Sequence, residues 1–177
     1  MDITFHYTPR ELAKQLIESV EMLPTDRLLE PFAGNGAFYD NFPIANPKDW
    51  AEIEKGRDFF EYNGKCDIII TNPPFFTIPD RKPIFYQCLA KCFEVAEKKV
   101  CVLVATKCLT SFTPLRLSKI AEQGWNITHI KVCNIKEWHG RYYFITFEKK
   151  PGFVSFITKS FSVDRIKSSD ATDPRRP

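Results

Sequence analysis

The tetrapeptide Asn72-Pro73-Pro74-Phe75 follows an apolar run at 66–71 and has the residue types for one particular chemistry. Two prolines cannot continue a sheet, and each removes a backbone donor, so the segment is rich in hydrogen-bond acceptors. The Asn72 side-chain oxygen and the Pro73 carbonyl could hold the hydrogens of a planar amine and free its lone pair, in a geometry fixed before substrate binds. Phe75 offers a ring on which a base or an amide can stack. The alternative is a Pro-Pro turn that only ends a strand.

A second segment, 30–38, places Gly34 and Gly36 between an apolar run and a possible short helix. Glycines at such a turn allow the backbone to approach a ligand closely, although they also suit a plain tight turn. Tyr39 stands where the fingerprint GxGxxG would need its third glycine, which disfavours a nicotinamide dinucleotide. The segment therefore predicts a nucleoside-like ligand without a pyrophosphate.

Acidic residues follow the glycine turn at distances that suit such a ligand. Glu52 lies about twenty residues on, at the end of an expected strand, where a carboxylate can accept from both ribose hydroxyls. We favour Glu52 over Glu54 for this position. Asp58 could accept from an adenine amino group while Phe59 packs on the ring. The alternatives are a solvated surface acid at 52 and a plain loop acid at 58.

Together, the segments 30–36 and 71–75 resemble the class I methyltransferases that carry the motif (D/N/S)PP(Y/F/W), especially the N6-adenine methyltransferases. The resemblance covers roughly residues 5 to 148 and implies S-adenosyl-L-methionine as cofactor. It implies that Asn72, Pro73, Pro74 and Phe75 activate the target amine. The cofactor site that it implies consists of Tyr7, Thr8, Pro9, Glu30, Phe32, Gly34, Gly36, Glu52, Asp58 and Phe59.

The expected reaction is methylation of adenine N6 in DNA, or in RNA. Methylation of guanine N2 in RNA or of a glutamine amide in a translation factor is an alternative, because the motif reports the amine and not the molecule. A catalytically silent nucleic-acid-binding subunit is a third possibility. Two features depart from the family pattern: the strand leading to Glu52 is short and follows 46–49, Asn-Pro-Lys-Asp, and we expect no separate recognition domain. A partner subunit could supply target recognition.

The elements that must position these residues alternate along the chain. Helices are expected over 9–21, with Thr8 as N-cap and Glu11 closing a capping box, over 37–42, over 83–98, and from Thr113-Pro114 to Gly124. Strands are expected over 27–32, 50–54, 66–71, 100–105, 125–132 and 142–147. This order predicts a doubly wound, mostly parallel, Rossmann-like α/β sheet with an antiparallel edge hairpin. We expect one domain over 1–150 and an extension over 151–177 with a disordered end.

Basic and aromatic residues in later loops are candidates for binding substrate. The charge is −6 over 1–74, +5 over 75–148 and +4 over 149–177, so the first part suits a cationic small molecule and the rest suits a polyanion. We expect nucleic acid as partner, DNA rather than RNA. For Trp138 and His139, a loop that caps the core is the alternative. The substrate-binding candidates are Phe76, Lys107, Trp138, His139 and Arg141.

Other classes of protein are disfavoured by the composition. The six cysteines lie mostly in apolar runs without paired CxxC motifs, which predicts reduced core thiols and no metal site. No apolar stretch is long enough for a membrane span, and the first residues lack a signal-peptide pattern. We expect an intracellular, cytoplasmic protein, with the nucleoid or nucleus as further possibilities.

Overall fold

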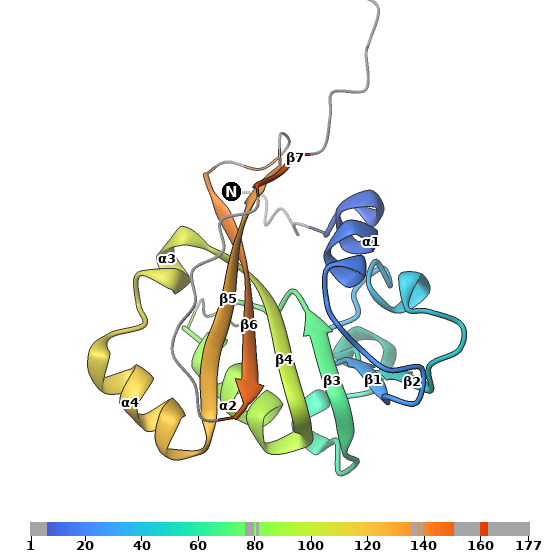
Figure 1. The fold of residues 1–177 in the computed structure, drawn as a ribbon, viewed down its shortest axis with the longest axis horizontal. Helices are drawn as coiled ribbons and strands as arrows, with labels where there is room; N and C mark the ends of the chain where they lie inside the picture. The colour runs from blue at the N-terminus through green and yellow to red at the C-terminus, as the bar shows by residue number, and fades with distance from the viewer. Residues whose placement is uncertain are drawn as a thin grey trace, which may run out of the picture.

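The computed structural model describes residues 7–76, 80, 82–135, 138, 140–150 and the backbone of 160–162 (Figure 1). The strands are β1 Leu28–Glu30, β2 Lys48–Trp50, β3 Cys66–Thr71, β4 Ala96–Ala105, β5 Trp125–Asn134, β6 Tyr142–Lys149 and β7 Ser160–Ser162. The α-helices are α1 Arg10–Glu18, α2 Phe85–Val95, α3 Thr106–Leu109 and α4 Pro114–Glu122, and the 3-10 helices are η1 Tyr39–Asn41, η2 Ile53–Lys55 and η3 Phe59–Glu61.

The strands form one seven-stranded sheet in the order β2-β1-β3-β4-β6-β5-β7. Neighbours from β2 to β4 are parallel, whereas β6 runs antiparallel to both β4 and β5. The doubly wound, mostly parallel sheet with an antiparallel hairpin is therefore confirmed. The second strand of the hairpin, β6, is the one that contacts β4. Beyond β5, the short β7 from the expected extension pairs parallel to it.

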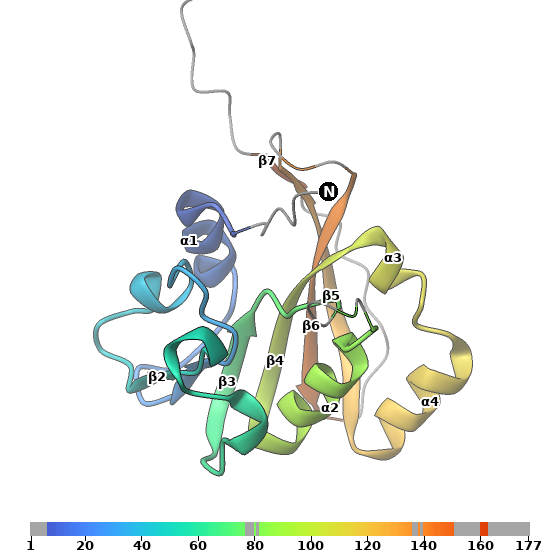
Figure 2. The same ribbon diagram turned by 180° about the vertical axis from the view of Figure 1, so that it is seen from behind.

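Helices cover both faces of the sheet, and each face has its own apolar core. On one face α1 packs on a cluster that includes Leu12, Leu16, Ile68 and Ile70. On the other face, α2 and α4 pack on a cluster that includes Ile69 (Figure 2). All six residues of β3 are buried, as is typical of a central parallel strand that is covered on both faces.

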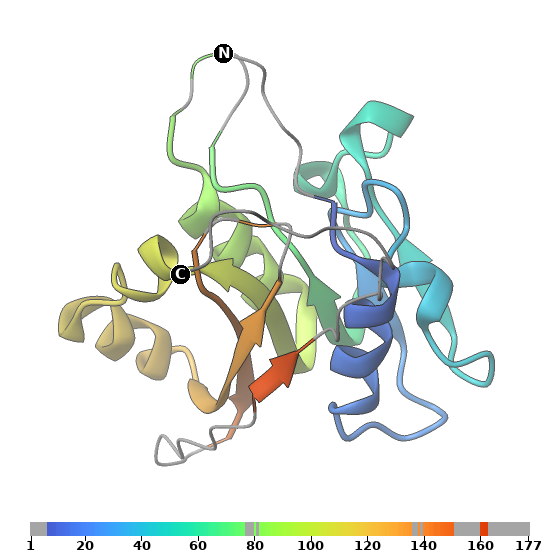
Figure 3. The same cartoon turned by 90° about the horizontal axis from the view of Figure 1, so that it is seen from above.

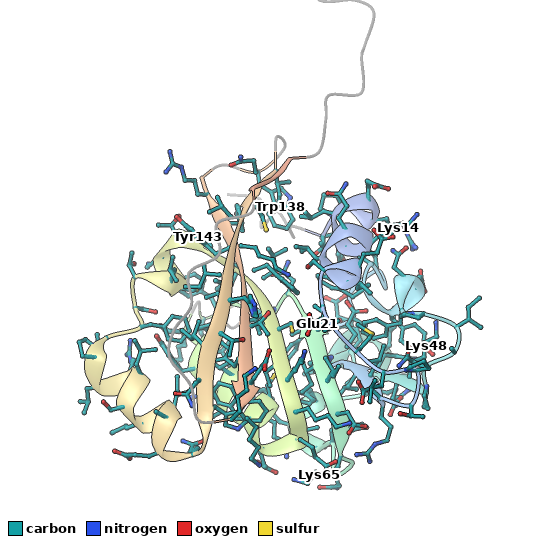
Figure 4. All side chains as sticks on the ribbon, viewed as in Figure 1. Lys14, Glu21, Lys48, Lys65, Trp138 and Tyr143 are labelled. Carbon is teal, nitrogen blue, oxygen red and sulfur yellow. The ribbon has the colours of Figure 1, made fainter. Side chains whose placement is uncertain are left out.

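The segments that follow β1, β2, β3, β4 and β5 share one end of the sheet, here called the carboxyl rim (Figure 3). The rim comprises residues 31–38, 51–58, 72–76, 106–113, 135, 138 and 140–141. In Figure 4, Lys65, just before β3, lies at the end of the sheet opposite to Trp138, which follows β5. Parallel strand direction therefore brings the predicted site segments together.

The start of α1 differs from the expectation. The N-cap is Pro9, and no side chain caps the helix, so the predictions of Thr8 as N-cap and of a capping box are wrong. The start of α4 is as expected, because the Thr113 hydroxyl accepts from the Arg116 backbone N–H at 3.4 Å. Gly124, with φ +84°, follows the end of α4.

Three other boundaries also differ. The second strand ends at Trp50 rather than at residue 54, and η2 follows it. The expected helix over 83–98 ends at Val95, because pairing with β3 starts β4 at Ala96. The expected helix over 37–42 is only the 3-10 turn η1.

A long-range contact anchors α1 to the sheet. The Lys131 ammonium on β5 donates to the carbonyl oxygen and the hydroxyl of Ser19, at 2.7 Å and 2.6 Å. A cation at the C-terminal end of a helix also interacts favourably with the helix dipole. The position of α1 is thus set by a strand more than 100 residues later.

The cysteines are free, and all but the half-buried Cys108 are buried, which confirms core thiols. Within the described residues, no group of three or more His, Cys, Asp or Glu side chains could hold a metal ion. No helix in the described part of the chain is both long and apolar enough to cross a bilayer. The expected disorder after residue 166 concerns residues outside the described ones.

Candidate active site at the carboxyl rim

Asn72 begins the rim segment directly after β3. Its side chain is half-buried, Pro73 is buried and Pro74 is exposed. The Asn72 Nδ2 atom donates to the Thr8 hydroxyl oxygen at 3.3 Å, which joins residues 64 positions apart. The structure therefore brings the predicted amine-activating segment against the residues that precede α1.

The two phenylalanines after Pro74 have different surroundings. Phe75 is half-buried and packs against the apolar core. The centroids of the Phe75 and Phe85 rings are 6.3 Å apart. Phe76 is also half-buried, and the Lys107 ammonium lies 5.4 Å from its ring centroid. An aromatic ring with a cation over it suits a base attached to a phosphate backbone.

The glycine turn needs left-handed backbone at two positions. Gly34 has φ +50° and Gly36 has φ +80°. A Cβ atom on Gly34 would lie 3.1 Å from Cε1 of Tyr7, so this exposed ring covers the turn closely. The Lys55 ammonium donates to the Gly34 carbonyl at 2.8 Å. Glycine is thus required at position 34 by both backbone conformation and space.

Glu52 lies at the start of η2, two residues after the end of β2. One carboxylate oxygen accepts from the Gly34 backbone N–H at 2.6 Å, and the other accepts from the Glu54 N–H at 3.2 Å. Each carboxylate oxygen has further acceptor capacity. The residue expected to hold a ribose therefore also holds the glycine turn in place.

Asp58 caps η3, where one of its oxygens accepts from the Phe60 N–H at 2.9 Å. Phe59, expected to pack on an adenine, is only 1% exposed, and its ring lies edge-on to Phe32 at 5.2 Å. Phe60 is 42% exposed. In this structure, Phe59 and Phe32 line the core beneath the turn, and Phe60 is the ring that reaches solvent.

Glu30 ends β1 with its side chain turned inward. It is 2% exposed, and its carboxylate accepts from the Tyr39 backbone N–H at 2.6 Å. Burial raises the pKa of Glu30 to about 8, the nearby charges of Asp40 and Glu52 add to the rise, and the backbone hydrogen bonds oppose it. Burial therefore favours the neutral acid form of Glu30, which lies beneath the glycine turn as a buried polar group.

The predicted substrate residues fall into three groups. Lys107 and Arg141 are exposed, and the Arg141 carbonyl accepts from the backbone and hydroxyl of Thr106, which places the two basic segments side by side. Trp138 is 8% exposed and packs edge-on against Tyr142 at 4.6 Å, so its ring belongs to the core. His139 lies outside the described residues.

The sequence matches no protein-family model and no curated protein sequence. The fold is similar to that of PH1948 from Pyrococcus horikoshii, assigned as an RNA methyltransferase, with a TM-score of 0.62 and 21% identity over 81% of this chain and 87% of that one. A protein from Listeria monocytogenes, assigned as a class I S-adenosylmethionine-dependent methyltransferase, gives 0.66 at 11% identity, over 84% and 63%. The 23S rRNA methyltransferase ErmE gives 0.62 at 12%, over 81% and 69%.

This chain has the class I methyltransferase fold. The TM-scores of 0.62–0.66 establish the shared fold, and the sequence identities of 11–21% leave the reaction and the substrate open. The chain spans less than two thirds of the Listeria structure.

The structure also places near the candidate site residues that were not predicted from the sequence. Arg10 forms an ion pair with Asp40 at 2.7 Å and donates to the Asn35 carbonyl at 3.3 Å, which ties α1 to the glycine turn. Lys55 borders the same turn, and Phe60, next to Phe59, has an exposed ring. No spacing rule points to Arg10 or Lys55, because their partners are distant in sequence. Phe60 is adjacent to Phe59, so the sequence offers it as an alternative ring for packing on an adenine.

Proposed function

We propose that this protein is an S-adenosylmethionine-dependent N-methyltransferase that acts on adenine N6 in nucleic acid. The observation that carries the proposal is the place of Asn72-Pro73-Pro74-Phe75, at the carboxyl end of β3 in a methyltransferase fold. Asn72 is fixed there by its hydrogen bond to Thr8. A bare Pro-Pro turn would need neither this contact nor the glycine turn beside it.

The residues of the rim fit a cationic, nucleoside-containing cofactor. The Glu52 carboxylate lies beside the turn, where it accepts from the Gly34 N–H, and the two left-handed glycines of the turn carry no side chain. The sulfonium and ammonium groups of S-adenosylmethionine are favoured near such a carboxylate. In this proposal, Gly34, Gly36 and Glu30 lie along the methionine end, together with Tyr7, Pro9 and the backbone of Thr8, whose side-chain hydroxyl is taken by Asn72. Glu52 holds the ribose, and Asp58 holds the adenine beside the half-buried Phe32, which Phe59 supports from the core.

The chain's own residues then act on the target amine. The Asn72 side-chain oxygen and the Pro73 carbonyl accept the two amine hydrogens, which favours pyramidal nitrogen and localises its lone pair. When bound, the cofactor would supply the methyl group, and the electrons of the broken sulfur–carbon bond would stay on sulfur. As the new N–C bond forms, the amine becomes more positive, so both hydrogen bonds strengthen in the transition state. The surplus proton leaves the nitrogen for water.

A nucleic-acid substrate is supported by the aromatic and basic residues around Asn72, and adenine by the resemblance of the motif to that of N6-adenine methyltransferases. Phe75 and Phe76 could stack on an extruded base, and Lys107 and Arg141 are exposed where a phosphate backbone would pass. Two of the similar structures, PH1948 and ErmE, are identified as RNA methyltransferases, so RNA has to be tested beside DNA.

The test is transfer of a labelled methyl group from S-adenosylmethionine to duplex DNA, single-stranded DNA, structured RNA and a protein extract, followed by nucleoside and amino-acid analysis. Label in N6-methyladenine supports the proposal and identifies the polymer. Label in guanine N2 or glutamine contradicts the substrate and keeps the reaction type. No label despite a cofactor-induced rise in melting temperature indicates a silent subunit or a missing partner.

Asn72→Ala separates the two halves of the proposed site. The variant should lose methyl transfer by about 100-fold, the usual size for one preorganised donor or acceptor. It should keep the stabilisation by cofactor, which follows RT ln(1 + [L]/Kd) and reaches about 2.7 kcal/mol at 100 times Kd. Equal loss of binding and transfer would contradict the division of roles.

A further inference from the structure

The Asn72 side chain can serve its proposed role in only one of two orientations. Its carboxamide has an acceptor end, Oδ1, and a donor end, Nδ2. An amine whose hydrogens must be held needs Oδ1, whereas Nδ2 would present hydrogens to hydrogens. The structure uses Nδ2 for the 3.3 Å bond to the Thr8 hydroxyl oxygen. Because the amide is planar and its two ends diverge, Oδ1 is directed away from Thr8.

From this contact, and resting on the proposed function, we propose that Thr8 is a positioning residue for methyl transfer: its hydroxyl accepts from Asn72 Nδ2 and keeps Oδ1 turned toward the target amine. A rotation of the amide by 180° would exchange the two ends and give up this bond. One hydrogen bond of ordinary strength favours the productive orientation about fivefold to tenfold.

The surroundings of Thr8 suit this role. Its side chain is 5% exposed, so little water competes for the hydroxyl. The hydroxyl is also not used as a helix cap, because the N-cap of α1 is Pro9. The helix that follows is held by the Arg10–Asp40 ion pair and, at its other end, by Lys131. Thr8 therefore presents its oxygen to Asn72 from a fixed position.

The first test compares Thr8→Val, which removes the hydroxyl at constant shape, with Thr8→Ser, which keeps it. Thr8→Val should lower kcat about fivefold to tenfold without weakening cofactor binding measured by calorimetry. Thr8→Ser should stay within twofold of the wild type. A rise in the cofactor Kd that accounts for the whole loss would overturn the proposal, because Thr8 would then act on the cofactor and not on Asn72.

The second test removes the need for an orientation. In Asn72→Asp both ends of the side chain are acceptors, and aspartate is one of the residues that the motif (D/N/S)PP(Y/F/W) allows. Adding Thr8→Val to Asn72→Asp should therefore change kcat by less than twofold. The same fivefold to tenfold loss in both backgrounds would show that Thr8 does not act through Asn72.

Thr71→Val is the matched control. Thr71 precedes Asn72 and is fully buried. Among the described residues, its hydroxyl is the one buried side-chain polar group that has no hydrogen-bond partner. Removing this hydroxyl makes the same chemical change within one residue of the site, and kcat should stay within twofold. A loss equal to that in Thr8→Val would overturn the specific role of Thr8.

A spectroscopic readout keeps this test independent of activity. The Asn72 side-chain NH2 signals in a ¹⁵N–¹H spectrum, assigned by their disappearance in Asn72→Asp, should shift in Thr8→Val and stay near their positions in Thr8→Ser. Unchanged signals in Thr8→Val would overturn the proposal. If the wild type transfers no methyl group to any substrate, the proposed function fails, and these spectra still decide the orientation of Asn72.

Discussion

The Glu52 carboxylate accepts a hydrogen bond from the backbone N–H of Gly34 at 2.6 Å. This contact ties the segment after β2 to the turn after β1. The Lys55 ammonium donates a hydrogen bond to the carbonyl oxygen of the same glycine, at 2.8 Å. The glycine turn is therefore shaped by side chains of its neighbour as well as by its own sequence, and changes at Glu52 should affect both stability and cofactor binding.

Replacing Glu52 by glutamine should weaken cofactor binding about tenfold and destabilise the fold by about 1–2 kcal/mol. The amide retains one acceptor for Gly34 and loses the charge that strengthens this bond. Calorimetric titration and urea unfolding measure the two effects. Glu54→Gln is the control, because Glu54 lies in the same turn and is exposed. Equal effects in both variants would indicate a general loss of negative charge.

Gly34→Ala should weaken cofactor binding more than Gly56→Ala does. Both glycines have left-handed backbone, with φ +50° and +74°, so alanine costs about 1–2 kcal/mol at either position. Only at Gly34 does the new Cβ meet a neighbour, the Tyr7 ring at 3.1 Å, whereas nothing lies within 4 Å at Gly56. Similar cofactor affinities in the two variants would contradict a tight fit of Tyr7 on the turn.

The raised pKa of Glu30 makes a prediction about alkaline stability. Its folded pKa of about 8 lies above the unfolded value of about 4.3, so its contribution to stability is fully present below pH 4.3 and is lost as the pH rises through about 8. Glu30→Gln mimics the neutral acid and should lose less melting temperature than the wild type between pH 6 and pH 9. Exposed Glu18→Gln should follow the wild type. Parallel curves for wild type and Glu30→Gln would refute the shift.

Asp67 makes the opposite prediction at acid pH. Burial opposes the shift, but hydrogen bonds from Arg27, at 2.9 Å, and from Lys98 outweigh it and lower the pKa of Asp67 to about 2. The contribution of Asp67 to stability is thus present above its unfolded pKa of about 3.9 and is lost as the pH falls toward about 2. Asp67→Asn should lower the melting temperature at pH 6 and show a smaller further drop between pH 5 and pH 2. An acid transition as steep as that of the wild type would exclude this role.

The sequence predicts the central helices and strands better than the residues at which they begin and end. The run 66–71 gives β3 with the right bounds, because its central isoleucines, 68–70, followed by Asn72-Pro73-Pro74 suit a strand buried on both faces. The helical pattern that continues past Val95 fails, because Ala96 pairs with Cys66 and tertiary pairing outweighs local periodicity. The strand over 50–54 is misplaced for a similar reason: its register with β1 ends at Trp50.

For the site, the segments are predictable and the orientations are not. Glycine and proline spacing identifies both rim segments, and parallel topology brings them together. Nothing in the dipeptide Phe59-Phe60 indicates which ring faces the core, since this depends on the single turn η3. Likewise, Thr8 has the residue type of an N-cap, and only the fold shows its hydroxyl beside Asn72.

The anchoring of α1 by Lys131 has a consequence for protein synthesis. A ribosome produces the glycine turn and the Asn72 segment long before β5, so the emerging chain holds these motifs without the contact that fixes α1 through Ser19. Because β6 lies between β4 and β5, the join between these two strands is completed only at residue 149. A nascent chain that ends before these strands therefore lacks the contact that fixes α1, and the proposed site takes its final shape only late in synthesis.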